Sequence, residues 1–590
     1  MVRRAPLVSA VVILTMLGVA ALTFGMSTRN SPSPGNVRCA DPDMSVPNPY
    51  PISGYWVFPR KDRCGWRTAL EAIHRVGGDT LIQFGPRLEP RRIGRTGQVL
   101  DDSGAVDPAF TDCVDGGKTC YQAARDALRA AHPANAIVQT YAYRSTEPFG
   151  GALAVCPEMD GRLVVGSRVY YRLLLPADAP GDETCDFGKG RQYRLILVAG
   201  STNDSVGMML DEADRFGMSA FVGLPTSPSD PVHKWTASLA HSDTLVAFTR
   251  RVLRSYAERY GGHASFRGFY QTFEIQLRRW RNPARATTLQ VYAAQHAVVD
   301  DVLPAKDILI SPYWDARRLV GSGTPPDQVR AGFMNAAATG VDIIAPQDSR
   351  GTGKAAPFWD HEAAQPVDRR LHPVFGVGDT TYDKAYYAPV RDYYRAAAQA
   401  RDRLAERGQH VELWATLEAF EPTGQPRCAP FTSRGRTDKA RLDGALTAAG
   451  PYPSKVISFM WDGLYTCRAG RPASLAEEIA GDWDRPIVTQ AFLSTRSGRD
   501  GLIVRGYRLD AGTVTLTWQG SGTRRLTVPG GGRYDPAAGR RNPKQPERME
   551  ELWVPLPKDR LRDARQVRID LTNGSGKRTL RPYPLLLPWP

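Results

Sequence analysis

Short runs rich in β-forming residues alternate with helical segments along most of the chain, and this alternation constrains the fold more than any other feature. Amphipathic helical segments, for example residues 66–77, 205–218 and 242–262, lie between the runs, and the last is expected to begin at Ser242 as N-cap and to end at Gly261 and Gly262. Eight parallel strand–helix units close into a barrel, so the predicted fold is an α/β (β/α)8 barrel. A doubly wound open sheet is the alternative, but no glycine-rich phosphate-binding turn follows the first run. The eight runs are GYWVFP (54–59), DTLIQFG (79–85), SAFVGLP (219–225), FRGFYQTFE (266–274), DILISPYWD (307–315), VDIIAPQD (341–348), VELWATLE (411–418) and VISFMWDG (456–463).

Two regions depart from the alternation. Residues 86–200 separate the second and third runs, and we interpret them as an insertion on the C-terminal face of the barrel, where insertions shape an active-site cleft. After about residue 485 only β-like runs separated by Gly, Pro and Asn follow, which predicts a small β-sandwich. The expected parts are a membrane-spanning signal anchor (1–28), a tether (29–50), the barrel (51–485) and the β-sandwich domain (486–590).

The N-terminus carries an apolar run, residues 5–26, that is long enough to cross a bilayer as a helix. Arg3 and Arg4 precede it, which favours an N-terminus in the cytoplasm and a globular part outside. Neither a small-x-small cleavage site nor a Cys directly follows the run, so we expect an uncleaved signal anchor in the cell membrane. Cleavage would instead give a secreted protein.

All eight cysteines follow this segment, and an even number in an exported chain predicts disulfides. No CxxC spacing occurs, so we expect neither a zinc site nor any other cofactor. The predicted pairs are Cys113–Cys120, Cys156–Cys185, Cys428–Cys467 and, with the two that remain, Cys39–Cys64.

The net charge of +15 suggests an acidic partner such as an anionic wall polymer or the membrane surface. The basic residues are mostly scattered arginines, and no dense basic run with interleaved aromatic residues occurs, so nucleic acid is not an expected partner.

Acidic and aromatic residues gather where the runs end. In a barrel these ends meet at one mouth, where reactive residues lie. Because side chains alternate along a strand, Glu418 should project into the mouth from VELWATLE, and Glu274 from GFYQTFE, although Gln271 then fits poorly on the outer side. The expected substrate-binding residues around this pair are Trp56, Gln271, Trp314, Asp315, Gln347, Asp348, Trp461 and Asp462.

Two opposed carboxyl groups are what glycoside hydrolysis requires, one to protonate the departing oxygen and one to attack the anomeric carbon or activate water. Aromatic rings beside them offer apolar platforms for sugar faces. Glu421, three residues after Glu418, is an alternative actor. No GxSxG, HExxH or phosphate-binding loop motif occurs, which disfavours esterase, zinc-protease and nucleotide chemistry.

Residues 54–462 resemble an uncharacterised family of barrel proteins, domain of unknown function 4434, which is grouped with the clan of retaining glycosidases. The segments that carry the resemblance are GYWVF (54–58), GFYQTFEI (268–275), ISPYWD (310–315), DIIAPQDSRGTG (342–353) and LWATLEAF (413–420). The resemblance implies an acid/base at Glu274 and a nucleophile at Glu418. Many members of that clan have Asn before the acid/base, whereas this chain has Phe273, so Gln271 or Gln347 would have to supply that hydrogen bond.

The sequence therefore predicts an extracytoplasmic glycoside hydrolase, of retaining type, acting on a cell-envelope polysaccharide or exopolysaccharide that carries negative charge. Glu274 would have a raised pKa through burial, and Glu418 would stay ionised. The alternative is a non-catalytic glycan-binding or envelope-assembly protein on the same barrel.

Overall fold

The computed structural model describes residues 39–424, 427–428, 431–496, 498–510, 512–519, 522–529, 533–534, 544, 546–556, 561 and 564–587. The predicted signal anchor and the first part of the tether lie outside these residues. Among the residues that are described, none of the helices has the length and apolar character needed to cross a bilayer.

Eight parallel strands close into a barrel in the order β1-β19-β15-β14-β13-β12-β11-β2, with β1 also paired to β2. This arrangement confirms the predicted barrel and excludes the open sheet. The strands are short and lie within the eight predicted runs, apart from Lys455 at the start of the last. They are β1 Gly54–Trp56, β2 Thr80–Ile82, β11 Ser219–Gly223, β12 Phe266–Gln271, β13 Asp307–Ile310, β14 Ile343–Ile344, β15 Glu412–Glu418 and β19 Lys455–Phe459.

A helix follows each barrel strand, and local sequence explains several of the helix ends. Asp62 caps the helix after β1 by accepting a hydrogen bond from Gly65 N at 2.8 Å. The helix after β11 begins at Ser242 and has His241 at its N-cap position with no side-chain cap, so the predicted Ser242 cap is wrong, whereas its end at Gly261 is confirmed. The helices are α2 Arg63–Arg75, α4 Ser205–Phe216, α5 Ser242–Tyr260, α6 Thr287–Val302, α7 Pro326–Ala337, α8 Tyr382–Ala385, α9 Val390–Ala405, α10 Lys439–Ala449 and α11 Leu475–Asp482.

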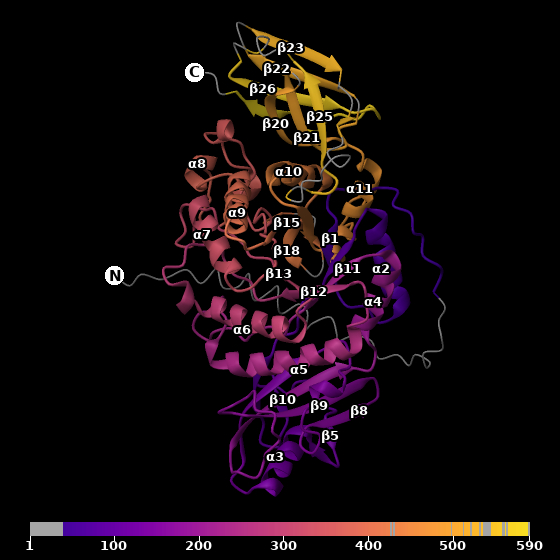
Figure 1. Ribbon diagram of the computed structural model, residues 1–590, viewed down its shortest axis with the longest axis vertical. Coiled ribbons are helices and arrows are strands. Elements are labelled where there is room, and N and C mark those ends of the chain that lie inside the picture. Colours follow the sequence, from indigo (N-terminus) through magenta and orange to yellow (C-terminus); the bar gives the residue numbers. More distant parts are fainter. Residues whose placement is uncertain are drawn as a thin grey trace.

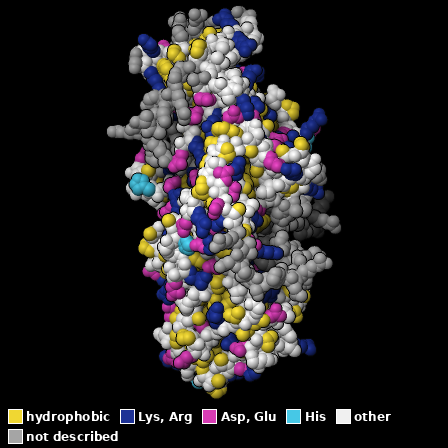
Figure 2. Space-filling model, turned by 90° about the vertical axis from the view of Figure 1, so that its right-hand side faces the viewer, with side chains coloured by type: hydrophobic (Ala, Val, Ile, Leu, Met, Phe, Trp, Pro, Cys, Tyr) yellow, Lys and Arg dark blue, Asp and Glu magenta, His cyan; other side chains and the backbone are white. Residues whose placement is uncertain are grey.

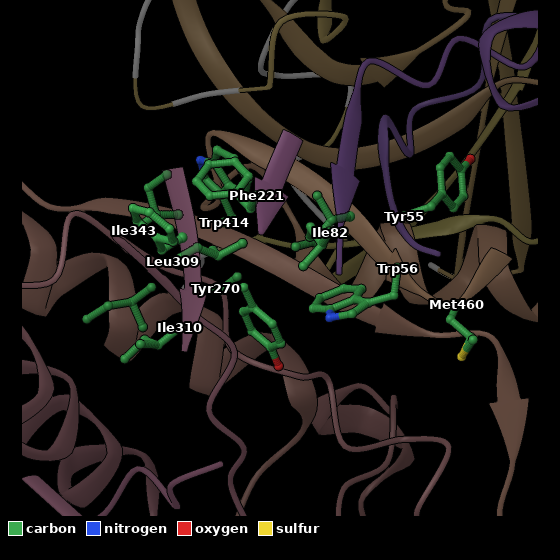
Figure 3. Packing of buried hydrophobic residues seen from close by; sticks show 14 of the residues in the cluster. Tyr55, Trp56, Ile82, Phe221, Tyr270, Leu309, Ile310, Ile343, Trp414 and Met460 are labelled. Atoms are coloured by element: carbon green, nitrogen blue, oxygen red, sulfur yellow. The ribbon is translucent and has the colours of Figure 1, made fainter. Parts of the chain in front are cut away.

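Large side chains fill the barrel interior in the alternation that the sequence predicts. Trp414 of β15 packs edge-on against Phe221 of β11, with ring centroids 5.9 Å apart, and Figure 3 shows the two rings together. On β12, Tyr270 points inward to Trp56, whereas Phe269 stacks on Tyr256 of the outer helix α5. The inward set therefore holds the barrel strands around one apolar core.

The insertion between β2 and α4 forms a sheet of its own, ordered β4-β3-β7-β10-β9-β8. It packs on the side of α5 that faces away from the barrel (Figure 1), where Arg251 of α5 donates to buried Asp160 at 2.9 Å. Its first residues, 86–88, follow β2 and exchange backbone hydrogen bonds with Thr226, which follows β11. The sheet thus covers a helix, whereas the sequence had suggested that it shapes the cleft. Its elements are β3 Glu89–Ile93, β4 Val99–Leu100, α3 Cys120–Ala131, β7 Ala136–Arg144, β8 Gly161–Val165, β9 Arg168–Pro176 and β10 Gln192–Ser201, with a small hairpin of β5 Val114–Asp115 and β6 Lys118–Thr119.

The C-terminal part consists of two four-stranded antiparallel sheets, β20-β21-β25-β24 and β23-β22-β26-β27. Their inner faces share an apolar cluster separate from the barrel core, which includes Val488, Leu516 and Ile569. This part rests on the barrel through contacts such as Arg391 of α9, whose guanidinium donates to Thr489 O at 2.9 Å. The strands are β20 Ile487–Arg496, β21 Arg499–Tyr507, β22 Thr513–Gln519, β23 Thr523–Pro529, β24 Arg533–Tyr534, β25 Glu550–Pro555, β26 Gln566–Thr572 and β27 Tyr583–Leu586.

A three-stranded sheet at the end of β15 was not predicted. It consists of β16 Phe420–Glu421, β17 Arg427–Cys428 and β18 Phe431–Arg436, in the order β16-β18-β17. The Cys428–Cys467 disulfide ties it to the segment after β19. That disulfide and the other three, Cys39–Cys64, Cys113–Cys120 and Cys156–Cys185, confirm all four predicted pairs.

Charged side chains are mixed on the surface. On the face shown in Figure 2, Lys and Arg side chains alternate with Asp and Glu, so the net positive charge forms no single-sign patch there.

Candidate active site

Glu418, the last residue of β15, is almost fully buried, with 2% of its surface exposed. Its Oε2 atom accepts hydrogen bonds from the backbone N–H groups of Gly351 and of Thr352, the latter at 3.2 Å, in the loop that follows β14. Gly351 permits this approach, because a Cβ atom there would lie 2.7 Å from Phe420 O. The carboxyl group is therefore held in one orientation at the mouth.

Asp348 lies next to Glu418, below the surface of the mouth. Its Oδ1 atom accepts hydrogen bonds from the backbone N–H groups of Arg350, at 3.2 Å, and of Glu418, at 3.4 Å. Its Oδ2 atom has no hydrogen-bond partner within the described ranges. Asp348 is thus a neighbour of Glu418, and its own contacts are internal to the protein.

Burial and the neighbouring Asp348 raise the pKa of Glu418 to about 8. Burial raises the pKa of Asp348 as well, against the attraction of Arg350. Ionisation of Glu418 beside Asp348 would place like charges in one buried site, which favours the protonated form of Glu418. The sequence led us to expect an ionised Glu418, whereas burial and the charge of Asp348 favour its protonated form. The effect of Asp348 was not apparent from the sequence, because Asp348 follows a different strand of the barrel.

Glu274 lies just past β12, in a segment that pairs with Tyr313 in the segment after β13. Tyr313 N donates to Ile275 O at 3.1 Å, and Leu277 N donates to Tyr313 O at 2.8 Å. Gln347, which follows β14, donates from Nε2 to Glu274 Oε1 at 3.0 Å and to Ser311 O at 3.0 Å. Gln347 thus connects Glu274 to the loop that holds Glu418.

The Glu274 side chain is reachable by solvent, although protein atoms surround its carboxyl group. That desolvation raises its pKa, while the hydrogen bond from Gln347 and the charge of Lys354 oppose the rise. Glu274 therefore combines access to a ligand with a raised pKa, the direction of shift that a general acid needs.

Lys354 is a residue of the mouth that sequence reasoning did not single out. Its ammonium nitrogen lies 3.9 Å from the centre of the Tyr313 ring, and its backbone carbonyl accepts a hydrogen bond from Ala316 N at 2.8 Å. Burial lowers its pKa, and Asp315, Glu274 and Glu418 oppose that change. The only signal in the sequence was its place at the end of the glycine-rich loop after β14.

Aromatic rings line the inner wall of the mouth. Trp56 packs edge-on against Tyr270, with centroids 5.7 Å apart, and Phe459 lies 6.0 Å from both Trp56 and Phe84. Trp56 itself is 1% exposed, and Figure 3 shows it next to Tyr270. The accessible ring surface belongs instead to the half-buried Phe84 and Phe459, neither of which was predicted as a platform.

Two predicted substrate contacts face the helices. Trp314 stacks on Tyr393 of α9 with centroids 5.3 Å apart and is fully buried. Gln271 donates to Gln295 Oε1 of α6 at 2.9 Å, which explains why it fitted poorly on the outer side of its strand. Both predictions are corrected, because the strands turn these side chains away from the mouth.

Three other predicted contacts are engaged within the protein. Asp315 accepts two hydrogen bonds from Arg317, at 2.8 and 2.7 Å. Asp462 accepts from Phe58 N at 2.7 Å and pairs with Arg60. Trp461, in the short helical turn η6 Trp461–Tyr465, is 2% exposed and stacks on Tyr465. These residues support the rim without offering free groups.

Glu421, the alternative actor, is held in an ion-pair network. It accepts hydrogen bonds from Arg350 at 2.8 Å and from Arg441 at 2.7 and 2.8 Å, and from the Thr437 hydroxyl at 2.6 Å. Although burial opposes it, these cations hold the pKa of Glu421 below its ordinary value. Glu421 is therefore a structural anion.

Other kinds of site find less support in the described part of the chain. It contains no group of three or more His, Cys, Asp or Glu side chains placed to hold a metal ion. A cavity of about 370 Å³ lies on the inserted sheet, bounded by β3, β7 and Tyr121 of α3, and contains none of the carboxyl groups described above.

Two family models match parts of the chain. Residues 193–472, which include Glu274 and Glu418, match the domain of unknown function DUF4434, and residues 101–199 of the insertion match a second domain of unknown function, DUF8405. No curated protein matches the chain.

Among solved structures, the chain is similar to a candidate alpha-L-fucosidase from Bacteroides thetaiotaomicron, at 14% identity and a TM-score of 0.37, over 78% of this chain and 96% of that one. It is similar to a beta-galactosidase from Marinomonas ef1 at 10% identity and a TM-score of 0.28, over 47% and 51% of the two chains. The catalytic domain of an endoglucanase from Xanthomonas campestris gives 14% identity and a TM-score of 0.28, over 66% and 99%. At these scores the likenesses do not identify a reaction, so the function proposed below rests on the geometry of the site.

Proposed function

We propose that the protein is an extracytoplasmic glycoside hydrolase that acts on a cell-envelope polysaccharide or exopolysaccharide, with Glu274 and Glu418 as its catalytic carboxyl groups. The observation that carries the proposal is their joint placement: both lie at the carboxyl end of the barrel, and residues of the loop after β14 contact each of them. Enzymes with this barrel have their active sites at that end.

The protonation states support a division of roles. Glu274 is accessible and its pKa is raised, so it can protonate the glycosidic oxygen as the bond to the anomeric carbon breaks. Glu418 attacks the anomeric carbon in its ionised form, and the N–H groups of Gly351 and Thr352 stabilise that carboxylate. Glu274 then deprotonates a water molecule, whose oxygen attacks the anomeric carbon and displaces Glu418 as a carboxylate, so that Glu274 is again the protonated acid.

The proposed location outside the cytoplasm is supported by the four disulfides, which persist in oxidising compartments. The apolar run at residues 5–26 would anchor the protein in the membrane.

A glycan-release assay on envelope polysaccharides tests the proposal. Glu274→Gln and Glu418→Gln should each lower turnover by about 10²–10⁴-fold, because each removes a proton-transfer or nucleophilic group. Glu406→Gln, at an exposed glutamate just after α9, is the matched control and should leave turnover unchanged. Wild-type turnover in both mouth variants would contradict the assignment.

A glycan-binding or envelope-assembly protein without catalysis is the second candidate, and the deep burial of Glu418 favours it. Binding of a glycan by the wild-type protein with no release of product, across the same polysaccharides, would identify this function.

A further inference from the structure

Lys354 is a cation at the mouth that has no close anionic partner. No carboxylate in the stretches that the structure describes lies within 4.0 Å of its ammonium nitrogen, and its contact is with the Tyr313 ring. A half-buried ammonium without an ion pair is costly, since burial disfavours the charged form. The depressed pKa of Lys354 reflects that cost.

Arg434 of β18 is a second cation of this kind. Its guanidinium carbon lies 5.6 Å from the centre of the Phe420 ring, and it too has no carboxylate within 4.0 Å among the described residues. Burial lowers its pKa, against the attraction of Glu418. The unpredicted three-stranded sheet thus brings a positive charge toward the same carboxyl group that Lys354 influences.

Other charged groups around the mouth are paired with one another. Arg317 donates two hydrogen bonds to Asp315, and Arg441 donates two to Glu421 and one to Asp368 at 2.9 Å. Arg350 lies 3.7 Å from Asp348 and donates to Glu421 at 2.8 Å. Lys354 and Arg434 differ from these arginines, because each lies against an aromatic ring with no described carboxylate within 4.0 Å.

We infer that Lys354, assisted by Arg434, binds an anionic group on the sugar, a carboxylate or a phosphate, and so makes the protein selective for acidic glycans. This inference rests on the proposed function, because it assigns the substrate class of the same site. An ammonium that exchanges partial burial beside a ring for a direct contact with an anion gains a charge-assisted hydrogen bond.

A glycan array with matched pairs tests the inference. The pairs are oligouronates with their carboxyl-reduced forms, and phosphorylated oligosaccharides with their phosphatase-treated forms, so the two kinds of pair separate carboxylate from phosphate recognition. The wild-type protein should bind the charged member of at least one kind of pair about tenfold more tightly or better. If no pair is bound more tightly in its charged form, the inference is wrong.

Three variants connect the preference to the residue. Lys354→Met should bring the two members of the preferred pair to within about twofold, and Lys354→Arg should keep most of the preference because it keeps the charge. Lys384→Met, at an exposed lysine of α8, should leave the preference intact. A preference that survives in Lys354→Met, with a melting temperature showing that the variant is folded, would assign the selectivity to another group.

Failure of the inference is distinguishable from failure of hydrolysis. A charge preference that depends on Lys354, together with no product release by the wild-type protein, would support the binding site and refute the enzyme. Hydrolysis that depends on Glu274 and Glu418 but is equally fast for charged and uncharged glycans would support the enzyme and refute the selectivity for acidic glycans.

Discussion

Replacing Glu418 by glutamine should make the folded protein more stable at alkaline pH, although the residue lies at the proposed catalytic centre. The native state holds the Glu418 proton up to a pKa of about 8, whereas an unfolded chain releases it near the ordinary value of 4.5. A folded-state pKa that is raised contributes stability below the unfolded pKa, and this contribution is lost as the pH rises toward 8. The wild-type protein therefore loses stability over this window, and a glutamine, which does not titrate, does not.

The size of this stabilisation follows from the shift in the pKa of Glu418. The difference between 4.5 and about 8, at about 1.4 kcal/mol for each pKa unit, corresponds to about 5 kcal/mol at pH 8 and above. With an unfolding entropy of about 2 cal/mol/K per residue, a unit of about 400 residues changes its melting temperature by about 5–6 °C for that free energy. Glutamine can still accept the hydrogen bonds of Gly351 and Thr352, so any cost of the substitution itself should be independent of pH.

The assay is the melting temperature of the variant minus that of the wild-type protein, measured at pH 5 and pH 8.5 with one heating rate. This difference should rise by about 5 °C between the two pH values. Glu421→Gln is the matched control, because the lowered pKa of Glu421 contributes stability that is fully present above its unfolded pKa of 4.5 and is lost only at lower pH, so its difference should stay nearly constant between pH 5 and pH 8.5. A difference for Glu418→Gln that does not change with pH would refute the claim that Glu418 is protonated in the folded protein.

Three further predictions test the surroundings of the site. Asp348→Asn removes the like charge beside Glu418 and should lower the pKa of Glu418 by at least about one unit. Carbon-13 NMR of the carboxyl group would measure this change directly, and the acidic limb of the pH–rate profile should shift to lower pH. The double change Cys428→Ser with Cys467→Ser opens a link across 39 residues and should cost about 4 kcal/mol of stability, seen as a lower melting temperature; an unchanged value would mean that the link does not constrain the unfolded chain. Trp314→Ala should cost about 3–5 kcal/mol, because the ring packs on α9, and leave glycan affinity unchanged, whereas a selective loss of affinity would restore Trp314 as a sugar platform.

Much of the fold was accessible from the sequence because the signals are local. Side chains alternate in direction along the strands, and Phe269, which packs outward on Tyr256 of α5, and the inward Trp414 follow that alternation. The sheet of β16, β17 and β18 escaped prediction because two of its strands span only two residues each, too few to show a period. The inserted sheet was recognised as an insertion, but its packing on α5 depends on contacts such as Arg251–Asp160 that join distant segments.

The candidate active site likewise has some features that the sequence predicts and others that depend on the folded chain. Strand parity was enough to place Glu274, Gln347 and Glu418 near the barrel mouth, since a strand end and its direction are local properties. Parity could not tell which strand-end groups would remain free. Asp315 meets Arg317 and Asp462 meets Arg60 only in the folded chain, and these pairs remove both acids from contact with a ligand.

The pattern of residues thus accounts for the barrel, the β-rich C-terminal part and the cysteine pairs, all of which follow from period, spacing or count along the chain. The proton on Glu418 and the unpaired charge of Lys354 required the folded molecule. Both depend on how far water is excluded and on which charges from other strands come within a few ångströms, and segments that are distant in sequence set those quantities.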